Sequence, residues 1–543
     1  MALDLTCRGA PRLGRPCPGG TLRLTLAATL ALTCAAPLLA PSLRAQRAVG
    51  ATVETRALLA ELDRYIPKAL AEWKGAGVAV GIVKDDSLIY ARGFGVREVG
   101  KRDPVDDRTV FAIGSNSKFF TAVAAGMLAD DGKLSLDDRI VKHLPWFQLH
   151  DPWVTREITL RDAMSHRSGL GRRGDPLWYG TPFSRDEIIR RVRHLVPNAS
   201  FRTEFGYQNI MFLTAGQVIA AAAGRSWDDV VRERIFAPLG MTSSSTSVTE
   251  LAGAPNVASP HNLGPGEATP TPIPYRNIDN IAPAGSINSN VQDMARWMRF
   301  VLNGGSLGGR QLLRSATLAQ LTAPHTVAQP VVSDSLNPSR HFSLYGLGIG
   351  LSDLHGVKVL QHTGGIDGML SFVAMVPERK LGIVVLTNTS GHNALYTALG
   401  TRILETFLGA PARDLSAMAL EQATRAERAA AERHRARLAQ RVADTRPSRP
   451  LAEYAGTYRH QMYGDLEVTL DGDALTLRYP RAMELVLHHF HFDTFMGTSR
   501  EATLLAPGAT LVQFALDALG AVASVEVEGL ETFTRVREGA GRP

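Results

Sequence analysis

Segments with the pattern of β-strands fall into two groups far apart in this 543-residue chain, and this separation limits the folds it can adopt. Residues 78–83 and 88–94 flank a short charged turn, which predicts a hairpin. Residues 357–362, 370–376 and 381–386 form a second group with short connections, so we expect these strands to be antiparallel neighbours. The two groups together predict one sheet built from both ends of a domain.

The stretch between the two strand groups is mainly helical in pattern. The predicted helices are residues 118–130, 210–223, 227–236 and 291–303, with another before the first hairpin at 57–73. We therefore expect an α/β domain of the α+β kind over about residues 52–410, in which helices flank an antiparallel sheet and a helical region is inserted. An active site is expected where the sheet and the insertion meet.

The end of the chain has a different composition. Residues 411–449 are rich in Ala, Arg and Glu and predict a helical linker that stops at a Pro-Ser-Arg-Pro sequence. Residues 450–540 alternate short apolar runs with turns, as in 466–470 and 475–477. This pattern predicts a small all-β domain, an antiparallel barrel or sandwich.

The first 45 residues have the pattern of a signal peptide. Four arginines precede an apolar run over residues 24–40 that ends near Ala45. An uncleaved anchor is the alternative, but the run is short for a spanning helix and Pro37 interrupts it. We expect cleavage and a periplasmic or secreted protein.

Removal of this leader would change the cysteine content and the net charge of the mature chain, and both limit its possible functions. All three cysteines, Cys7, Cys17 and Cys34, lie inside it, so the mature chain would have no disulfide, no thiol catalysis and no Cys-zinc site. The leader also holds five arginines and one aspartate, and without them the net charge falls from +7 to +3. We therefore expect no nucleic-acid partner. No later segment approaches 18 uninterrupted apolar residues, so we expect no stable membrane span.

The first candidate catalytic motif is Ser115-Asn116-Ser117-Lys118, at the start of an apolar helical pattern. A serine there lies in the positive field of the helix N-terminus, and a lysine one turn later emerges on the same face. The amine can take the hydroxyl proton if burial keeps enough of it neutral. A lone match is weak evidence, and the alternative is a capping serine beside a solvated lysine. The position at the mouth of an apolar helix favours Ser115 as nucleophile and Lys118 as its base.

The second motif is Tyr207-Gln208-Asn209, directly before a predicted helix. A phenol and an amide two residues apart project to the same side of an extended segment, where the phenol can relay protons and the amide can bind lysine and substrate. Tyr275-Arg276-Asn277 has the same spacing but follows a proline-rich loop. We prefer the first match and assign Tyr275 to the pocket rim.

The third motif is His362-Thr363-Gly364-Gly365, at the end of a predicted strand. Glycines let a substrate backbone approach closely, and a threonine can bind a carboxylate or an amide. The N–H of Gly365 can form an oxyanion hole with that of Ser115. On its own, the motif favours an ordinary glycine-rich turn with an exposed histidine.

The three motifs in this order resemble those of β-lactamase-like, penicillin-recognising serine hydrolases. That family includes class C β-lactamases, serine D-Ala-D-Ala carboxypeptidases, D-aminopeptidases and some carboxylesterases. The resemblance covers about residues 55–408. It extends to Leu160–Leu170, Pro238–Met241, Ala284–Ile287 and Tyr345–Gly348. The fold that it implies, an antiparallel sheet flanked by helices with a helical insertion, agrees with the strand order above.

The resemblance also implies roles for single residues. The implied catalytic residues are Ser115, Lys118 and Tyr207. The implied substrate-binding residues are Asn209, His362, Thr363 and Gly364, and the implied oxyanion hole consists of the Ser115 and Gly365 N–H groups. Class C β-lactamases have a lysine where this chain has His362, whose charge near neutral pH is conditional. Efficient β-lactam hydrolysis is therefore not our first expectation.

These features predict an exported serine hydrolase that forms an acyl-enzyme on Ser115 and cleaves an amide or ester. The expected substrate is a D-amino-acid peptide, a β-lactam-like compound or a small ester. The alternatives are a true β-lactamase and a catalytically idle protein that binds cell-wall fragments. No metal or organic cofactor is expected.

Two further patterns are set aside. Gly304-Gly305-Ser306-Leu307-Gly308 matches the nucleophile elbow of α/β-hydrolases, but that motif needs a strand before it, and here a helix is predicted. His488, His489 and His491 suggest metal binding only loosely, because no further ligand stands at a known spacing.

Overall fold

A computed structural model describes residues 43–328, 335–391, 393–479, 483–499 and 509–537, with side chains from Thr55 onward. Residues 1–58 and 59–543 form two compact units. The described residues of the first unit belong to helix α1 (Leu43–Glu72). All but the end of the predicted signal peptide lies outside the described residues.

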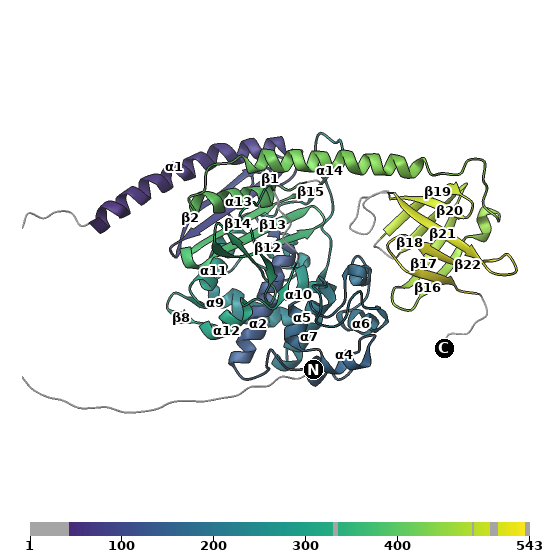
Figure 1. Cartoon of the computed structure of the whole chain (residues 1–543), viewed down its shortest axis with the longest axis horizontal. Coiled ribbons are helices and arrows are strands. Elements are labelled where there is room, and N and C mark those ends of the chain that lie inside the picture. The colour runs from purple at the N-terminus through teal and green to yellow at the C-terminus, as the bar shows by residue number, and fades with distance from the viewer. Residues whose placement is uncertain (1–42, 329–334, 392, 480–482, 500–508, 538–543) are drawn as a thin grey trace, which may run out of the picture. The chain divides into compact units, whose positions relative to one another are not determined.

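An antiparallel sheet forms the centre of the second unit, as Figure 1 shows, in the order β2-β1-β14-β13-β12-β11-β10-β9. The two hairpin strands are β1 (Gly77–Lys84) and β2 (Ser87–Gly95). The later strands are β9 (Thr326–Val327), β10 (Ser343–Tyr345), β11 (Gly350–Leu354), β12 (Val357–Ile366), β13 (Met369–Val376) and β14 (Leu381–Thr387). Because β1 pairs directly with β14, the two strand groups form one sheet as predicted.

The sheet is buried on both faces, because its strands alternate apolar side chains between two cores. Val80 and Val385 pack with α1 and with α13 (Leu395–Phe407). Ala79 and Val384 belong to the core on the other side, with α2 (Ser117–Asp130) and α11 (Val291–Leu302). Burial on both faces accounts for the nearly continuous apolar runs in the sequence.

The helical insertion lies between β2 and β9 in the sequence. Its longest members are α2, α7 (Asn209–Ala223) and α11. The shorter helices are α3 (Ile140–His143), α4 (Pro152–Glu157), α5 (Leu160–Met164), α6 (Arg185–Arg191), α8 (Trp227–Val231), α9 (Ala237–Leu239), α10 (Ala282–Gly285) and α12 (Ser315–Leu321). α2 is buried on every side from Ser117 to Leu128, so it runs through the core rather than along the surface. α7 ends at Gly224 with φ +69°, a left-handed cap that glycine adopts without strain.

Short strand pairs form small sheets outside the central sheet. They are β3 (Phe111–Ala112) with β6 (Asn288–Ser289), β15 (Thr389–Gly391) with β4 (His261–Leu263), β4 with β5 (Thr271–Pro272), and β7 (Ser306–Leu307) with β8 (Arg310–Gln311). β3 leads directly into the segment that carries Ser115.

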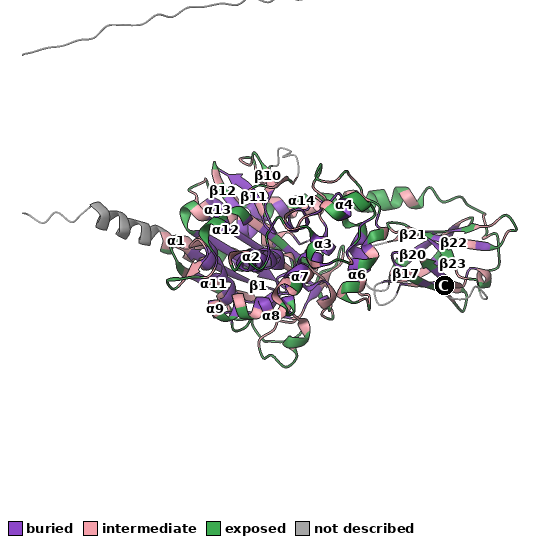
Figure 2. Cartoon of the chain, turned by 90° about the horizontal axis from the view of Figure 1, so that it is seen from below, coloured by how far each residue is buried: buried purple, intermediate pink, exposed green. Residues whose placement is uncertain are grey.

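The end of the chain forms a helix and a closed barrel. α14 (Leu415–Leu438) is mostly exposed, as the green ribbon in Figure 2 shows. The barrel strands are β16 (Gly456–His460), β17 (Gly464–Asp471), β18 (Ala474–Tyr479), β19 (Met483–His491), β20 (Thr494–Ser499), β21 (Thr510–Leu516), β22 (Val522–Val527) and β23 (Thr532–Arg535). Pairing of β16 with β23 closes the barrel and confirms the predicted all-β domain. None of the helices in the described ranges has the length and hydropathy of a membrane-spanning segment.

Candidate active site

Ser115 lies in a 3₁₀ turn, Gly114–Asn116, that runs directly into α2. Three hydrogen bonds fix this turn. Ser117 Oγ donates to Gly114 O at 2.7 Å, Asn116 Nδ2 donates to Ser371 Oγ at 2.8 Å, and Ser371 Oγ donates to the carbonyl before the turn at 2.7 Å. Because Ser371 belongs to β13, the nucleophile is anchored to the sheet as well as to the helix.

Lys118 is completely buried and points at Ser115. Its Nζ lies 3.0 Å from Ser115 Oγ, 2.8 Å from Asn209 Oδ1 and 2.7 Å from Ala284 O. The amide and carbonyl oxygens can only accept hydrogens, so a neutral amine that donates to both turns its lone pair toward the serine hydroxyl. Burial lowers the pKa of Lys118 well below its usual value near 10.5, and the nearby charge of Arg172 lowers it further. The environment therefore favours the form that can take a proton from Ser115.

Tyr207 and Asn209 converge on the same point, as predicted. α7 begins at Asn209, and Gln208 caps it by accepting a hydrogen bond from Ile210 N at 3.0 Å. The Tyr207 hydroxyl is hydrogen-bonded to Ser115, and its ring centre lies 4.9 Å from Lys118 Nζ. Burial raises the pKa of Tyr207, so the phenol is protonated at neutral pH and can donate a proton.

The competing Tyr275 motif is not part of this cluster. The Tyr275 hydroxyl donates to Ala258 O at 2.7 Å, and Tyr275 is not among the described residues that line the Ser115 cavity. Its assignment to the pocket rim was wrong, because the hydroxyl turns away to satisfy a backbone carbonyl. Ile273 and Ile278 on either side of it line the cavity instead.

The third motif lies within β12, which continues to Ile366, beyond the predicted end of the strand. A Cβ on Gly364 would lie 1.9 Å from Ile113 O, so β12 can pack against the nucleophile turn only with glycine there. A Cβ on Gly114 would lie 2.5 Å from Gly365 N, which shows that this N–H is next to the turn of Ser115. The close contact between the turn and the strand accounts for these glycines, and it brings the backbone of Gly365 next to the turn that carries Ser115.

His362 is neutral in this arrangement. Its Nδ1 lies 2.6 Å from Thr363 O, and its Nε2 lies 2.9 Å from the Tyr345 hydroxyl. Because a carbonyl can only accept, Nδ1 carries the hydrogen and Nε2 accepts from the tyrosine. Burial lowers the pKa of His362 to about 4. The site therefore has no positive charge at position 362 near neutral pH, whereas Thr363 lines the cavity with an exposed side chain.

The sequence analysis missed Asp175, which orients Asn209. Asp175 Oδ1 accepts from Asn209 Nδ2 at 3.0 Å and from Trp178 Nε1 at 2.8 Å. A carboxylate that accepts from the amide nitrogen leaves the amide oxygen facing Lys118. Asp175 lies in a 3₁₀ segment, Arg172–Leu177, inside a loop with no helical or strand periodicity, so no sequence signal identified it.

His166 also supports the site, and it was noted only as part of the resemblance. It is completely buried, its Nδ1 accepts from Gln208 N at 3.1 Å, and its ring centre lies 4.2 Å from that of Tyr207. Its backbone has φ +58°, an uncommon conformation for residues other than glycine. His166 therefore positions the segment that carries Tyr207.

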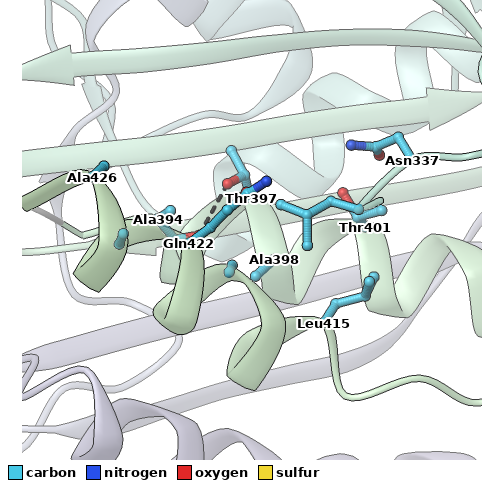
Figure 3. Close-up of a pocket in the computed structure, with 11 residues that line it drawn as sticks. Asn337, Ala394, Thr397, Ala398, Thr401, Leu415, Gln422 and Ala426 are labelled. Carbon is cyan, nitrogen blue, oxygen red and sulfur yellow. Dashed lines mark hydrogen bonds between the residues drawn. The ribbon is translucent and has the colours of Figure 1, made fainter. Parts of the chain in front are cut away.

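Two cavities of the described structure differ in the chemistry of their linings. The Ser115 cavity, of about 650 Å³, combines the polar groups above with apolar side chains. These apolar side chains include Trp178, Leu263, Ile273, Ile278, Ile281 and Leu370. A cavity of about 350 Å³ between α13 and α14 is lined by small, apolar and neutral side chains such as Ala398, Thr401 and Leu415 (Figure 3). No ionisable residue lines the second cavity in the described part of the chain, so the Ser115 cavity is the candidate active site.

The two patterns set aside from the sequence do not contribute to this site. Gly304 and Gly305 follow α11 with φ +69° and +88°, which is the helix end and turn predicted for the elbow-like sequence. His489 Nε2 lies 3.0 Å from Phe492 O. Over the described ranges, no group of three or more His, Cys, Asp or Glu residues is arranged to hold a metal ion.

Comparison with known proteins gives matches along most of the chain. The unguisins hydrolase of Aspergillus violaceofuscus is 27% identical over 85% of this chain and 86% of its own length. Penicillin-binding protein 4 of Amycolatopsis lactamdurans is 29% identical over 62% of this chain and 86% of its own length. The octameric penicillin-binding protein homologue from Pyrococcus abyssi has a similar fold, with a TM-score of 0.58 at 23% identity, over 88% of this chain and 99% of that one.

Two family models match the chain, one over the α/β domain and one over the C-terminal barrel. Residues 440–539 match a domain of unknown function, DUF3471. Residues 62–407 match the family described as Beta-lactamase, and this match spans the sheet, the helical insertion and every residue of the candidate site. The chain therefore belongs to the beta-lactamase family.

Proposed function

We propose that this protein is an exported serine hydrolase that transfers the acyl group of an amide or ester first to Ser115 and then to water. The observation that carries the proposal is the position of Lys118. Its buried amine lies within hydrogen-bond distance of Ser115 Oγ and also donates to two oxygens that can only accept, Asn209 Oδ1 and Ala284 O. The family assignment and the hydrolase named among the relatives support the same chemistry.

In the proposed first step, Lys118 takes the hydroxyl proton as Ser115 Oγ attacks the substrate carbonyl carbon. The negative charge that develops on the carbonyl oxygen is stabilised by the N–H groups of Ser115 and Gly365. Tyr207 passes a proton to the leaving group as the carbon–heteroatom bond breaks, and the proton held by Lys118 restores the phenol. Water then attacks the ester on Ser115, and the same two groups move one proton from this water to Ser115 Oγ as the acid product leaves.

The proposed substrates are D-amino-acid peptides, β-lactam-like amides and small esters. The apolar half of the cavity, formed by residues such as Ile278 and Leu370, is suited to a hydrophobic side chain on the substrate. One solved structure of SurE, a protein of similar fold, contains D-Leu, so D-leucine derivatives belong in the first screen.

The direct test uses the purified mature protein and a fluorescent fluorophosphonate or penicillin. Wild type should be labelled covalently and Ser115→Ala should not, and mass spectrometry should locate the adduct on Ser115. Equal labelling of both proteins would reject Ser115 as the nucleophile. Hydrolysis of p-nitrophenyl esters and D-leucine amides, with Ser115→Ala as the control, measures turnover, and rapid nitrocefin hydrolysis would favour a true β-lactamase.

Export is proposed from the N-terminal sequence pattern alone. Cell fractionation and N-terminal sequencing of the accumulated protein would test it. A mature protein that begins near residue 46 outside the cytoplasm is expected, and an intact N-terminus in the cytoplasm would contradict the proposal.

A further inference from the structure

We propose that Arg172 binds a carboxylate of the substrate and takes the place of a cation at position 362. The inference rests on the proposed function and narrows its substrate class. It predicts substrates that carry a free carboxylate on the leaving group, next to the bond that is broken.

The charges around the cavity lead to this assignment. Among the described residues that line the Ser115 cavity, Arg172 is the only lysine or arginine. His362 is kept neutral by its burial, and both of its ring nitrogens are already hydrogen-bonded, one to Tyr345 and one to Thr363. The single lining carboxylate, Asp367, already accepts from Arg276 Nε at 2.9 Å and from the Tyr179 hydroxyl. The cavity therefore presents one permanent positive charge and a carboxylate that is already paired, which favours an anionic substrate over a cationic one.

Arg172 has unused hydrogen-bonding capacity. Its guanidinium carbon lies 4.5 Å from the centre of the Tyr207 ring, and 61% of its side chain is exposed. In the described structure its guanidinium has one polar contact, a long 3.4 Å approach of Nη1 to Asp175 Oδ2. The other oxygen of Asp175 accepts from Asn209 and Trp178. A planar guanidinium with free donors matches the two oxygens of a carboxylate.

The position of Arg172 also indicates which part of the substrate it binds. The guanidinium packs on the ring of Tyr207, and the hydroxyl of the same tyrosine is hydrogen-bonded to Ser115. In the proposed mechanism, Tyr207 protonates the leaving group. A carboxylate on Arg172 therefore belongs to the leaving group, as it would in a peptide or ester with a free C-terminal end.

Arg340 is the rival residue. It lines an adjoining cavity of about 460 Å³ that shares Tyr207, His362 and Thr363 with the Ser115 cavity. If the leaving group extended across β12 into that cavity, Arg340 would bind the carboxylate. The experiment must therefore include both arginines.

The experiment compares two substrates that differ only in charge, N-acetyl-D-leucyl-D-lactate and the same ester with a terminal carboxamide. We expect wild type to prefer the acid. Arg172→Gln should lower kcat/KM for the acid about 10- to 100-fold, mainly through KM, because it removes a charge-assisted hydrogen bond. Its kcat/KM for the carboxamide and for p-nitrophenyl acetate should fall less than for the acid and by similar factors, because any effect of the Arg172 charge on the pKa of Lys118 acts on every substrate alike.

Arg173→Gln is the matched control, because Arg173 is the next residue, is 59% exposed and faces Glu531 instead of the cavity. It should retain the preference for the acid. The inference is overturned if wild type shows no preference, or if Arg340→Gln rather than Arg172→Gln removes it. It is also overturned if Arg172→Gln slows all three substrates equally with a shifted pH profile, which would mean that Arg172 acts through Lys118.

Binding without turnover separates this inference from the proposed function. Calorimetry uses Ser115→Ala, which cannot form the acyl-enzyme, with intact N-acetyl-D-leucyl-D-lactate. The dissociation constant of this acid should rise about tenfold or more when Arg172→Gln is added. The same ester with a terminal carboxamide should bind both proteins equally. If no substrate is hydrolysed but this difference is found, the proposed function fails and the role of Arg172 stands. Equal binding of the acid by both proteins would overturn the role of Arg172.

Discussion

The hydroxyl of Tyr345 donates to Nε2 of His362 at 2.9 Å, and this contact fixes the tautomer of a histidine that burial keeps neutral. The tyrosine can donate there only because Nδ1 holds the hydrogen that is directed to Thr363 O. Protonation of His362 would place a second hydrogen on Nε2, facing the tyrosine hydroxyl, in a site with no carboxylate partner for it among the described contacts. A histidine in this position therefore acts as a neutral member of a hydrogen-bonded chain.

The first prediction concerns stability against pH. The pKa of His362 is about 4 in the folded protein and near 6.5 when unfolded. Between these values the unfolded state binds more protons, so the free energy of unfolding falls as the pH decreases from 6.5 to 4. The contribution of this histidine is roughly 3 kcal/mol. In urea unfolding at pH 7 and pH 4.5, His362→Gln should lose less stability than wild type, and an equal loss would contradict the assignment.

The second prediction concerns Lys118. Lys118→Met keeps an unbranched side chain of similar length but removes the base, so the rate of Ser115 acylation should fall on the order of 10²- to 10⁴-fold. Burial lowers the pKa of Lys118, so the folded state binds this proton more weakly than the unfolded state does, which lowers the free energy of unfolding. Lys118→Met removes this cost but leaves Asn209 Oδ1 and Ala284 O without this donor, so the two effects oppose each other and the variant should remain folded with a stability within about 2 kcal/mol of wild type. Stopped-flow labelling and urea unfolding measure the two effects, and a variant that is inactive because it is unfolded would not support the role.

The helices and strands of the chain were predictable because they depend on local patterns. Two short apolar runs separated by a turn predicted the strands β13 and β14, and helical spacing of apolar residues predicted α11. The structure confirms all three elements. The pairing of β1 with β14 joins segments far apart in the sequence. It was predicted only as the joining of two strand groups into one sheet, without the identity of the paired strands. Site residues could be identified from the sequence where they belong to a recognisable motif, as Ser115 and Lys118 do.

The parts of the site that could not be predicted come from irregular segments. Arg172 and Asp175 lie in a loop whose conformation depends on contacts with distant residues, and periodicity carries no information about such contacts. The glycines of β12 were identified, but the reason for them was incomplete. Gly364 lies against the nucleophile turn, and this packing appears only when residues 113 and 364 are brought together.

The third prediction uses that packing. Gly364→Ala would place a methyl group 1.9 Å from Ile113 O, so β12 and the nucleophile turn must separate. We expect a loss of unfolding free energy of about 1–3 kcal/mol or more, together with slower acylation of Ser115. Gly365→Ala is the neighbouring control, because its Cβ would meet only the side chain of Leu370 at 3.3 Å. Equal stability of the two variants in urea unfolding would show that the close contact does not exist.

The fourth prediction concerns the C-terminal barrel, which holds the segment that carries Arg172 and Asp175. Tyr463 donates its hydroxyl hydrogen to Arg173 O at 2.8 Å, and the Tyr479 hydroxyl lies 3.1 Å from Pro176 O. These carbonyls flank Asp175, so the barrel restrains the backbone that orients Asn209. The double variant Tyr463→Phe and Tyr479→Phe keeps the apolar packing and removes only the hydroxyls. Its kcat should fall a few-fold, about the effect of losing one or two hydrogen bonds of roughly 1 kcal/mol each, because Asn209 is held less firmly.

Tyr458 provides the matched control for that experiment, since its hydroxyl donates to Tyr454 O at 2.6 Å within the barrel. Tyr458→Phe removes a hydrogen bond of the same kind but one that does not reach the Arg172–Leu177 segment. It should lower the unfolding free energy by a similar amount and leave kcat unchanged. Hydrogen exchange at residues 172–177 should increase in the double variant and not in the control, since only the double variant releases this segment. If both variants had the same kcat and the same exchange, the barrel would be folded onto the hydrolase domain without restraining its active site.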